Sequence, residues 1–238
     1  MTTKFEKFNN HRYNAHASLP SEESFLTDKV YLYKIFKSLK KLLPKESRIL
    51  EIGCADGSFA KFLMKENYQV LGLDIAEEAL HLAQANGVNA QVANIEEGLT
   101  ITENNFDAVV AAEIIEHLYD TDFFIEEIKK VLKKDGYIFI STPNLASLKN
   151  RCKLLFGAYP QYSEYNLAPT SAGHIRNYTI PTLKKQLLDH DFKIIKITSP
   201  NLLCPMAKNV PKFLKYLAIW LGDIFPSFGS HIIIVAKK

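Results

Sequence analysis

Two patterns of apolar residues alternate along the chain, and each predicts a different kind of element. Short, mostly apolar runs predict β-strands at residues 48–52, 69–74, 90–93, 106–112, 137–142, 192–198 and 230–238. Apolar residues spaced three or four apart predict amphipathic helices at 22–43, 57–67, 76–86, 120–133, 145–156, 181–190 and 206–222. Apolar strands that alternate with helices are typical of a parallel sheet with helices on both faces.

The pattern predicts one α/β domain with additions at its edges. The length of 238 residues suits a single domain of this class, and no internal repeat, low-complexity tract or clear linker divides it. The alternating core covers residues 45–142, and segment 1–44 precedes it as an N-terminal helical lid. Beyond Pro143 the pattern loosens, which predicts two substrate caps, at 145–178 and 200–228.

The loop after the first predicted strand is built from small residues and carries an acid. It reads Gly-Cys-Ala-Asp-Gly at 53–57 and follows Glu51. In an open α/β sheet, ligands bind beyond the carboxyl ends of the strands, where this loop lies. It lacks the third glycine of a dinucleotide fingerprint and the Gly-Lys-Ser/Thr of a P-loop, and Asp56 would repel a pyrophosphate. The loop therefore favours a ligand with a nearby positive charge.

Residues 51–57, Glu-Ile-Gly-Cys-Ala-Asp-Gly, resemble the first motif of class I S-adenosylmethionine-dependent methyltransferases, an acidic residue followed by Gly-x-Gly-x-Gly. Ala55 replaces the middle glycine, and we expect it to have a negative φ, which alanine adopts without strain. The resemblance is strong over 45–142 and looser over 174–238. It implies a Rossmann-like, doubly wound α/β fold with a seven-stranded, mostly parallel sheet that ends in an antiparallel C-terminal strand, and helical cap insertions.

The same resemblance implies which residues hold S-adenosylmethionine. The family's second motif is an acid at the end of the second strand, and Asp74 stands there, where a carboxylate accepts hydrogen bonds from both ribose hydroxyls. Ile75 flanks the adenine, and the third motif places Asn94, where the family usually has Asp, at the adenine amino group. The set implied as cofactor-binding is Glu51, Gly53, Ala55, Asp56, Gly57, Asp74, Ile75, Asn94, Ile95 and Glu113.

The stretch FDAVVAAEIIEHLYD, at 106–120, suggests a second kind of chemistry. A helix beginning at Ala112 would place Glu113, Glu116 and His117 on one face. Two carboxylates and an imidazole on one face suit a divalent cation such as Mg²⁺ or Mn²⁺. The Glu-x-x-Glu-His order resembles the metal motif of small-RNA 3′-end methyltransferases and a similar stretch in ubiquinone-pathway O-methyltransferases. Those families add a later histidine, for which His174 is the candidate.

Two interpretations of this stretch stay open. With a metal, Glu113, Glu116, His117 and His174 are its ligands, and the metal lowers the pKa of a bound acceptor hydroxyl. Many metal-free relatives carry a similar stretch, in which Glu116 caps or pairs and His117 acts as a base or packs. On either interpretation His117 and His174 are the candidate catalytic residues.

Charge is unevenly distributed along the chain. Residues 1–144 hold 16 Lys/Arg against 22 Asp/Glu, a net charge of −6, and residues 145–238 hold 13 against 4, a net charge of +9. The C-terminal third is therefore expected either to meet an anionic partner or to present a solvated basic face. Segment 206–222 is both apolar and basic, which predicts peripheral membrane contact or a lipid-like acceptor, with a core helix or a dimer interface as the alternative.

Composition narrows the cellular setting. The three cysteines are odd in number and have no Cys-x-x-Cys spacing, which favours a reducing compartment over a disulfide framework. The N-terminal residues lack the apolar core of a signal peptide, and no run approaches the roughly 20 apolar residues that span a bilayer. We therefore expect a cytoplasmic protein that is a monomer or a homodimer.

The resemblance implies a methyltransferase, and the residues leave its acceptor open. We expect O-methylation of a small molecule or of a lipid or glycan intermediate. One alternative is a metal-dependent RNA 3′-end methyltransferase, although the chain has no recognisable RNA-binding module and we expect no nucleic-acid partner. A second alternative is a module that binds the cofactor without turnover.

Overall fold

A seven-stranded sheet in the order β3-β2-β1-β4-β5-β7-β6 forms the centre of the computed structural model, which describes residues 25, 29–101, 105–164, 173–202 and 211–238. The strands are β1 (Arg48–Ile52), β2 (Gln69–Asp74), β3 (Asn89–Val92), β4 (Phe106–Ala112), β5 (Leu132–Pro143), β6 (Lys193–Thr198) and β7 (His231–Lys237). β7 runs antiparallel to β5 and β6, and the pairs among β1 to β5 are parallel. This confirms the mostly parallel sheet with an antiparallel C-terminal strand.

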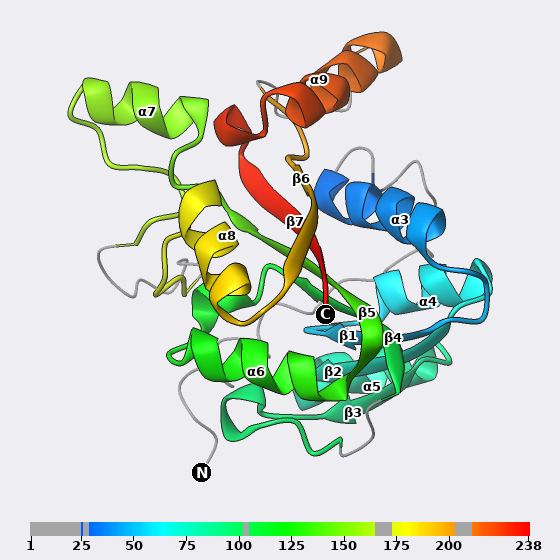
Figure 1. Cartoon of the computed structure of the whole chain (residues 1–238). Helices are drawn as coiled ribbons and strands as arrows, with labels where there is room; N and C mark the ends of the chain where they lie inside the picture. Colours follow the sequence, from blue (N-terminus) through cyan, green and yellow to red (C-terminus); the bar gives the residue numbers. More distant parts are fainter. Residues whose placement is uncertain (1–24, 26–28, 102–104, 165–172, 203–210) are drawn as a thin grey trace.

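Helices cover both faces of the sheet (Figure 1). One face packs against α3 (Val30–Leu42), α4 (Ser58–Lys65) and α5 (Glu77–Ala85). The other packs against α6 (Thr121–Val131) and α8 (Ile180–Asp189). This arrangement is the doubly wound fold that the alternating apolar pattern predicts.

The core explains why the strands are apolar along their whole length. Successive residues of a strand point to opposite faces of a sheet. Val109 accordingly joins the cluster under α6 and α8, and Val110 joins the cluster under α3 and α4. Both side chains are fully buried, and so are Ala108 and Ala111 on either side of them. A central strand covered on both faces has no solvent-exposed position for a polar residue.

The expected elements are present, with ends that differ by a few residues from the sequence-based ranges. The helix expected at 22–43 is described from Val30 on, and of the lid residues before it only Phe25 and Lys29 are among the described residues. The helix expected at 206–222 corresponds to α9 (Lys212–Ile224). Its expected first turn, from 206 to 210, lies outside the described residues. Among the described helices, none combines the length and apolar character needed to cross a bilayer.

The caps hold two helices that project beyond the sheet. α7 (Leu148–Leu155) follows β5, and α9 precedes the short helix η3 (Pro226–Phe228) and β7. In Figure 1 both helices stand at the upper end of the molecule, away from the helices that cover the sheet.

The parallel strands end together at one edge of the sheet, which we term the carboxyl edge. Because β7 is antiparallel to β5, it begins where β5 ends, and His231 lies opposite Pro143. The carboxyl edge therefore collects the residues after β1, β2, β3, β4 and β5 and the first residue of β7.

Candidate functional site

The loop after β1 is tied to the end of β2 by backbone hydrogen bonds. The N–H groups of Gly53 and Cys54 both donate to the carbonyl of Leu73, at 2.8 and 3.0 Å. Gly53 has φ +77°, and a Cβ at this position would lie 2.2 Å from the Ile114 side chain. A glycine is therefore required at position 53 both by conformation and by space.

The expected negative φ of Ala55 is wrong. Ala55 has φ +49°, in the left-handed region, and its N–H donates to Asp74 Oδ2 at 2.8 Å. The tight turn that directs this N–H toward β2 needs a left-handed residue, which is why the family motif has glycine there. Gly57 at φ +71° completes the turn as the N-cap of α4, and Asp56 accepts a hydrogen bond from Ser58 N at 3.1 Å.

Asp74 lies at the end of β2 and accepts backbone hydrogen bonds with both of its carboxylate oxygens. Its Oδ1 accepts from Ala76 N at 2.9 Å, and its Oδ2 accepts from Ala55 N. A carboxylate has about four lone-pair sites, and the backbone contacts do not fill all of them, which leaves capacity for an external donor. Burial raises the pKa of Asp74, and the backbone N–H groups partly offset that rise because they stabilise the charged form.

Glu51, in β1, is a buried carboxyl with an unsatisfied oxygen. Only 5% of the residue is exposed, and its Oε2 has no hydrogen-bond partner. Burial raises the pKa of Glu51 to about 8, since the charged form loses its hydration. A buried carboxyl with one unpartnered oxygen beside the ligand loop is ready to receive a cationic or hydrogen-bond-donating group.

Asn94 caps the short helix η1 (Ile95–Glu97), which follows β3. Its Oδ1 accepts from Glu96 N at 3.2 Å, and its Nδ2 donates to Glu97 Oε1 at 2.6 Å. Ile95 and Ile75 are both partly exposed beside the carboxyl edge. The capping role is consistent with the position of Asn94 after β3 and leaves one lone pair of its amide oxygen for another donor.

Glu113, Glu116 and His117 do not lie on one helical face, so that expectation is wrong. Glu113 follows β4 in a left-handed conformation at φ +60°, and only Ile115–His117 forms a short 3₁₀ helix, η2. The left-handed residue turns the chain sharply. Glu113 therefore meets Ser141 of β5 and His231 of β7.

Glu113 pairs with His231, a residue that sequence reasoning missed. Glu113 Oε2 lies 3.2 Å from His231 Nε2, and Oε1 accepts from Ser141 Oγ at 2.7 Å. Burial alone would raise the pKa of Glu113, but the pairing with His231 and the Ser141 bond lower it. The same pairing outweighs the burial of His231 and raises the pKa of its imidazole. His231 also stacks on Tyr31, with ring centroids 5.8 Å apart.

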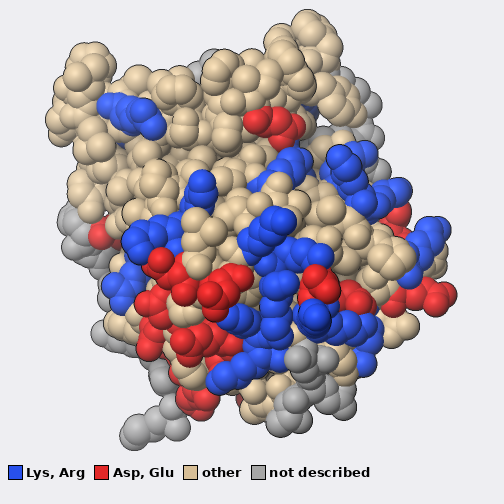
Figure 2. Space-filling model, in the orientation of Figure 1, with Lys and Arg blue, Asp and Glu red and all other residues tan. Residues whose placement is uncertain are grey.

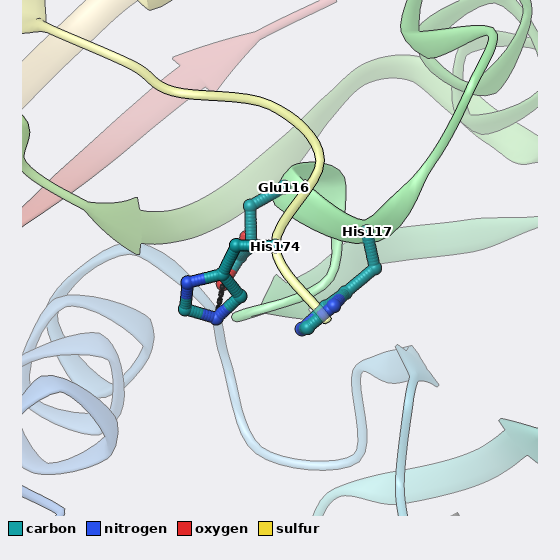
Figure 3. Close-up of side chains that lie close together, drawn as sticks. All are labelled: Glu116, His117 and His174. Atoms are coloured by element: carbon teal, nitrogen blue, oxygen red, sulfur yellow. Dashed lines mark ion pairs between the residues drawn. The ribbon is translucent and has the colours of Figure 1, made fainter. Parts of the chain in front are cut away.

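A second cluster joins Glu116, His117 and His174 (Figure 3). One ligand atom from each residue lies within 4.8 Å of the others, and His174 Nε2 is 4.0 Å from Glu116 Oε1. Glu116 is 1% exposed, and both of its carboxylate oxygens are buried without a hydrogen-bond partner. Burial, and then the neighbouring Glu113 charge, raise the pKa of Glu116 well above its ordinary value.

Backbone contacts orient both histidines of this cluster. His117 Nδ1 lies 3.1 Å from Gly173 O, and His174 Nδ1 lies 2.9 Å from Tyr162 O. A carbonyl oxygen only accepts, so each Nδ1 carries a proton, and in the neutral form of such a ring the lone pair is on Nε2. A ring whose Nδ1 is held by a backbone carbonyl is typical of imidazoles that serve as metal ligands or bases.

The segment that carries His174 is attached to η2 through its backbone. The N–H groups of Ile175 and Arg176 donate to Glu116 O at 2.9 and 3.0 Å. Glu164 accepts from Gly173 N and His174 N. These contacts bring His174 beside Glu116 and His117, which lie about 60 positions earlier in the chain. In the sequence, only the family resemblance indicated that these residues would meet.

The described site thus divides the expected residues into three groups. The first group lies around the ends of β1, β2 and β3 and consists of Glu51, Gly53, Ala55, Asp56, Gly57, Asp74, Ile75, Asn94 and Ile95. Glu116, His117 and His174 form the cluster beyond β4, and Glu113 belongs with Ser141 and His231. The antiparallel direction of β7 was the signal that could have located His231, because it returns the start of β7 to the carboxyl edge.

Comparison with known proteins gives the family. A methyltransferase-domain family model matches residues 28–197, more than half of the chain. The ubiquinone biosynthesis O-methyltransferase of Pelagibacter ubique is 29% identical over 200 residues, which cover 74% of this chain and 80% of that protein. The mitochondrial ubiquinone biosynthesis O-methyltransferase of Bos taurus is 32% identical over 118 residues, 46% of this chain and 32% of that protein.

Solved structures share the fold. An S-adenosylmethionine-dependent methyltransferase of Thermotoga maritima, described as a possible histamine N-methyltransferase, has a TM-score of 0.65 at 20% identity, with 98% of each chain covered. One of Archaeoglobus fulgidus has a TM-score of 0.60 at 19% identity and covers 87% of this chain and 94% of that one. The strand order, the ligand loop after β1 and the family match together identify the chain as a member of the S-adenosylmethionine-dependent methyltransferases.

Proposed function

We propose that this methyltransferase transfers the methyl group to a hydroxyl oxygen of a small molecule. The observation that carries the proposal is the cluster of two imidazoles, His117 and His174, beside the buried Glu116 carboxyl, with His174 Nε2 4.0 Å from Glu116 Oε1. An imidazole nitrogen with a lone pair suits the removal of a proton from a hydroxyl. The similarity to a protein named as a ubiquinone biosynthesis O-methyltransferase supports a small-molecule acceptor.

On this proposal the cofactor occupies the carboxyl ends of β1, β2 and β3. Asp74 accepts hydrogen bonds from the ribose hydroxyls, and Glu51 faces the cationic end of the cofactor. The cofactor lies against the loop after β1, which contains Gly53, Ala55, Asp56 and Gly57. Ile75 and Ile95 flank the adenine. Asn94 accepts a hydrogen bond from the adenine amino group with the lone pair of its amide oxygen that the η1 cap does not use.

The proposed reaction moves one methyl group and one proton. The acceptor oxygen forms a bond to the methyl carbon, the carbon–sulfur bond breaks, and its electron pair stays on sulfur as the sulfonium becomes a thioether. The hydroxyl proton goes to Nε2 of His117 or His174, whose Nδ1 atoms are held by backbone carbonyls. The protein's contribution is alignment of the two reactants and exclusion of water.

The cluster also fits a divalent cation. Two imidazole nitrogens and one carboxylate form a donor set that suits Mn²⁺ better than Mg²⁺, which prefers oxygen ligands. Glu116, His117 and His174 would hold the metal, and Glu113, which was also expected as a ligand, pairs with His231 instead. A bound metal would lower the pKa of an acceptor hydroxyl.

Transfer of a labelled methyl group to fractionated cell extract, with and without chelator, tests the function. The expected result is label in small organic molecules and none in RNA. Label at RNA 3′ ends would favour the RNA methyltransferase alternative, and cofactor binding without label in any fraction would favour a non-catalytic module. Either outcome contradicts the proposal.

Manganese binding tests the cluster separately from activity. Electron paramagnetic resonance of free Mn²⁺ measures binding to the wild-type protein and to Glu116→Gln and His174→Ala. We expect both substitutions to weaken binding at least about tenfold, because each removes one of three protein ligands. His190→Ala is the matched control, since His190 pairs with Asp122 outside the cluster. Equal binding by all four proteins would exclude this metal site.

A further inference from the structure

The two cap helices present large apolar side chains to solvent. Leu155 and Phe156, at the end of α7, are 79% and 83% exposed, and Phe213 in α9 is 69% exposed. α9 buries Ala218 and Ile219, while Phe213, Leu217, Trp220 and Ile224 recur at helical spacing on its exposed side. We term Leu155, Phe156, Phe213, Leu217, Trp220 and Ile224 the apolar tip. An apolar surface of this extent on a globular protein marks an interaction site.

The apolar tip belongs to one contiguous part of the fold. α7 and α9 both contact η3, and the Arg151 guanidinium lies 4.8 Å from the centre of the Phe228 ring. Figure 1 shows the two helices projecting from the same end of the molecule. In the view of Figure 2 that end shows few charged side chains, whereas charges crowd the opposite half. The two helices can therefore meet one flat partner together.

The charges beside the apolar tip are almost all positive. Lys149, Arg151 and Lys153 lie in α7, and Lys215 lies in α9. Among the described residues of α7, α9 and η3, Asp223 is the one acid, and it pairs with Lys34 at 2.9 Å. Aromatic and leucine side chains beside lysine and arginine match the interface of an anionic bilayer, where rings lie at headgroup level and cations meet lipid phosphates.

A second copy of the chain is a poorer occupant of this surface. A symmetric dimer through the apolar tip would bring the basic side chains of both protomers into one interface, with few acids to pair with them. That arrangement costs electrostatic free energy, whereas anionic lipid supplies the missing opposite charge. Charge complementarity therefore favours the lipid surface.

We propose that the apolar tip docks this protein on an anionic membrane surface. The proposal extends the expected contact of 206–222 to α7, which the sequence patterns did not indicate. It stands apart from the proposed function, because docking is measured without an acceptor. Phe156, Phe213 and Trp220 would enter the interface, and Lys149 and Arg151 would lie among the lipid phosphates.

Trp220 provides an intrinsic probe, because it is the one tryptophan of the chain. Vesicles of phosphatidylcholine with 30% phosphatidylglycerol should shift its emission to shorter wavelength, and lipids brominated on the acyl chains should quench it. Vesicles of phosphatidylcholine alone, or added salt, should weaken both effects, because the attraction to anionic lipid is screened. No shift and no quenching with the anionic vesicles would overturn the proposal.

Vesicle sedimentation of substituted proteins locates the surface. We expect Phe156→Asp and Phe213→Asp each to lower the apparent partition coefficient at least about tenfold, because each replaces an inserted ring by a charge that lipid phosphates repel. Val92→Asp is the matched control, since Val92 is an exposed apolar residue of the edge strand β3. Circular dichroism and thermal melting confirm that each variant is folded.

Two results would contradict docking through the apolar tip. One is equal loss of vesicle binding in Val92→Asp, which would mean that the effect is not local. The other combines two observations on the same protein. The wild-type protein does not bind vesicles, and it forms a dimer in analytical ultracentrifugation that Phe156→Asp converts to monomer. That result would assign the apolar tip to contact between copies of this chain.

Discussion

Ala55 holds a backbone conformation that costs free energy in this protein. Its φ of +49° lies in the left-handed region, where an L-residue with a Cβ is less stable by roughly 1–2 kcal/mol. The conformation is kept because the Ala55 N–H donates to Asp74 Oδ2 across the ligand loop. The hydrogen bond between the loop after β1 and Asp74, at the end of β2, thus fixes the position of these two cofactor-binding segments relative to each other.

Ala55→Gly is expected to stabilise the protein. Relief of the left-handed strain outweighs the greater backbone entropy of glycine in the unfolded chain, which leaves a gain of about 0.5–1 kcal/mol in the free energy of unfolding. Urea denaturation measures the change. Ala85→Gly, at an exposed position in α5, is the control and should have the opposite sign because glycine weakens a helix. A loss of stability in Ala55→Gly would contradict this account of the loop.

Glu51 makes the stability of the cofactor-free protein depend on pH. Its pKa of about 8 in the folded state lies above the ordinary carboxyl value of 4.5, so the folded state binds the extra proton between those values. The stabilising effect is fully present below pH 4.5 and is lost as the pH rises through 8. This loss of stability therefore falls between pH 4.5 and about pH 8.

Glu51→Gln should remove this part of the pH dependence. Between pH 6 and pH 9 the wild-type protein should lose on the order of 2 kcal/mol more stability than the variant, because glutamine resembles the protonated acid at every pH. Urea denaturation of both proteins at several pH values gives the difference, in which all other titrating groups cancel. Parallel pH profiles would show that Glu51 is ionised in the folded protein.

At the scale of elements, a buried lysine ties the cap helix α9 to the core. Lys34, in α3, is 4% exposed, donates to Ile219 O at 2.7 Å and lies 2.9 Å from Asp223. Thr198, at the end of β6, also bonds to Asp223. Burial lowers the pKa of Lys34, and the Asp223 carboxylate partly offsets that effect. Three elements distant in sequence meet at this ion pair.

Lys34→Met should weaken the attachment of α9. The substitution keeps the volume of the stem but leaves the Ile219 carbonyl and Asp223 without the ammonium, which should lower the free energy of unfolding by about 1–3 kcal/mol. Lys40→Met is the control, because the Lys40–Glu66 pair is exposed and such pairs contribute less than about 1 kcal/mol. Denaturant titration gives the free energy of unfolding of both variants. Equal losses would show that the Lys34–Asp223 contact does not attach α9 to the core.

At the scale of the whole molecule, the sheet order separates two halves of the carboxyl edge. The order reverses between β1 and β4, which is the switch point at which open α/β sheets bind ligands. The cofactor residues follow β1, β2 and β3 on one side. The Glu116–His117–His174 cluster and the Glu113–His231 pair lie on the other side, near β4, β5 and β7.

S-adenosylmethionine should stabilise the whole fold against heat. A ligand at about 100 times its Kd adds roughly 2.7 kcal/mol, which for a protein of this size corresponds to a rise in Tm of about 5–10 °C. Differential scanning fluorimetry measures the rise. NAD should give none, and Asp74→Ala should lose the response while Glu78→Ala, with an exposed acid on α5, retains it. No rise with S-adenosylmethionine would contradict the cofactor assignment.

The sequence predicted the local features of this protein well because they depend on neighbouring residues. Strand and helix positions follow from the spacing of apolar side chains, and the small-residue loop after Glu51 follows from the need for close backbone approach. The φ of Ala55 and the orientation of Glu113 were predicted wrongly. In both cases a hydrogen bond or ion pair to another strand decides the conformation, and periodicity does not encode such contacts.

By itself, the sequence determined the doubly wound sheet, the ligand loop and the carboxylate Asp74 at the end of β2, since each depends on short-range pattern and chain stereochemistry. Only the tertiary structure decided that His231 meets Glu113, that His174 joins Glu116 and His117, and that α7 and α9 share one exposed apolar end. These contacts join residues 50 to 120 positions apart. They arise because an antiparallel last strand and two inserted caps return distant segments to the same edge of the sheet.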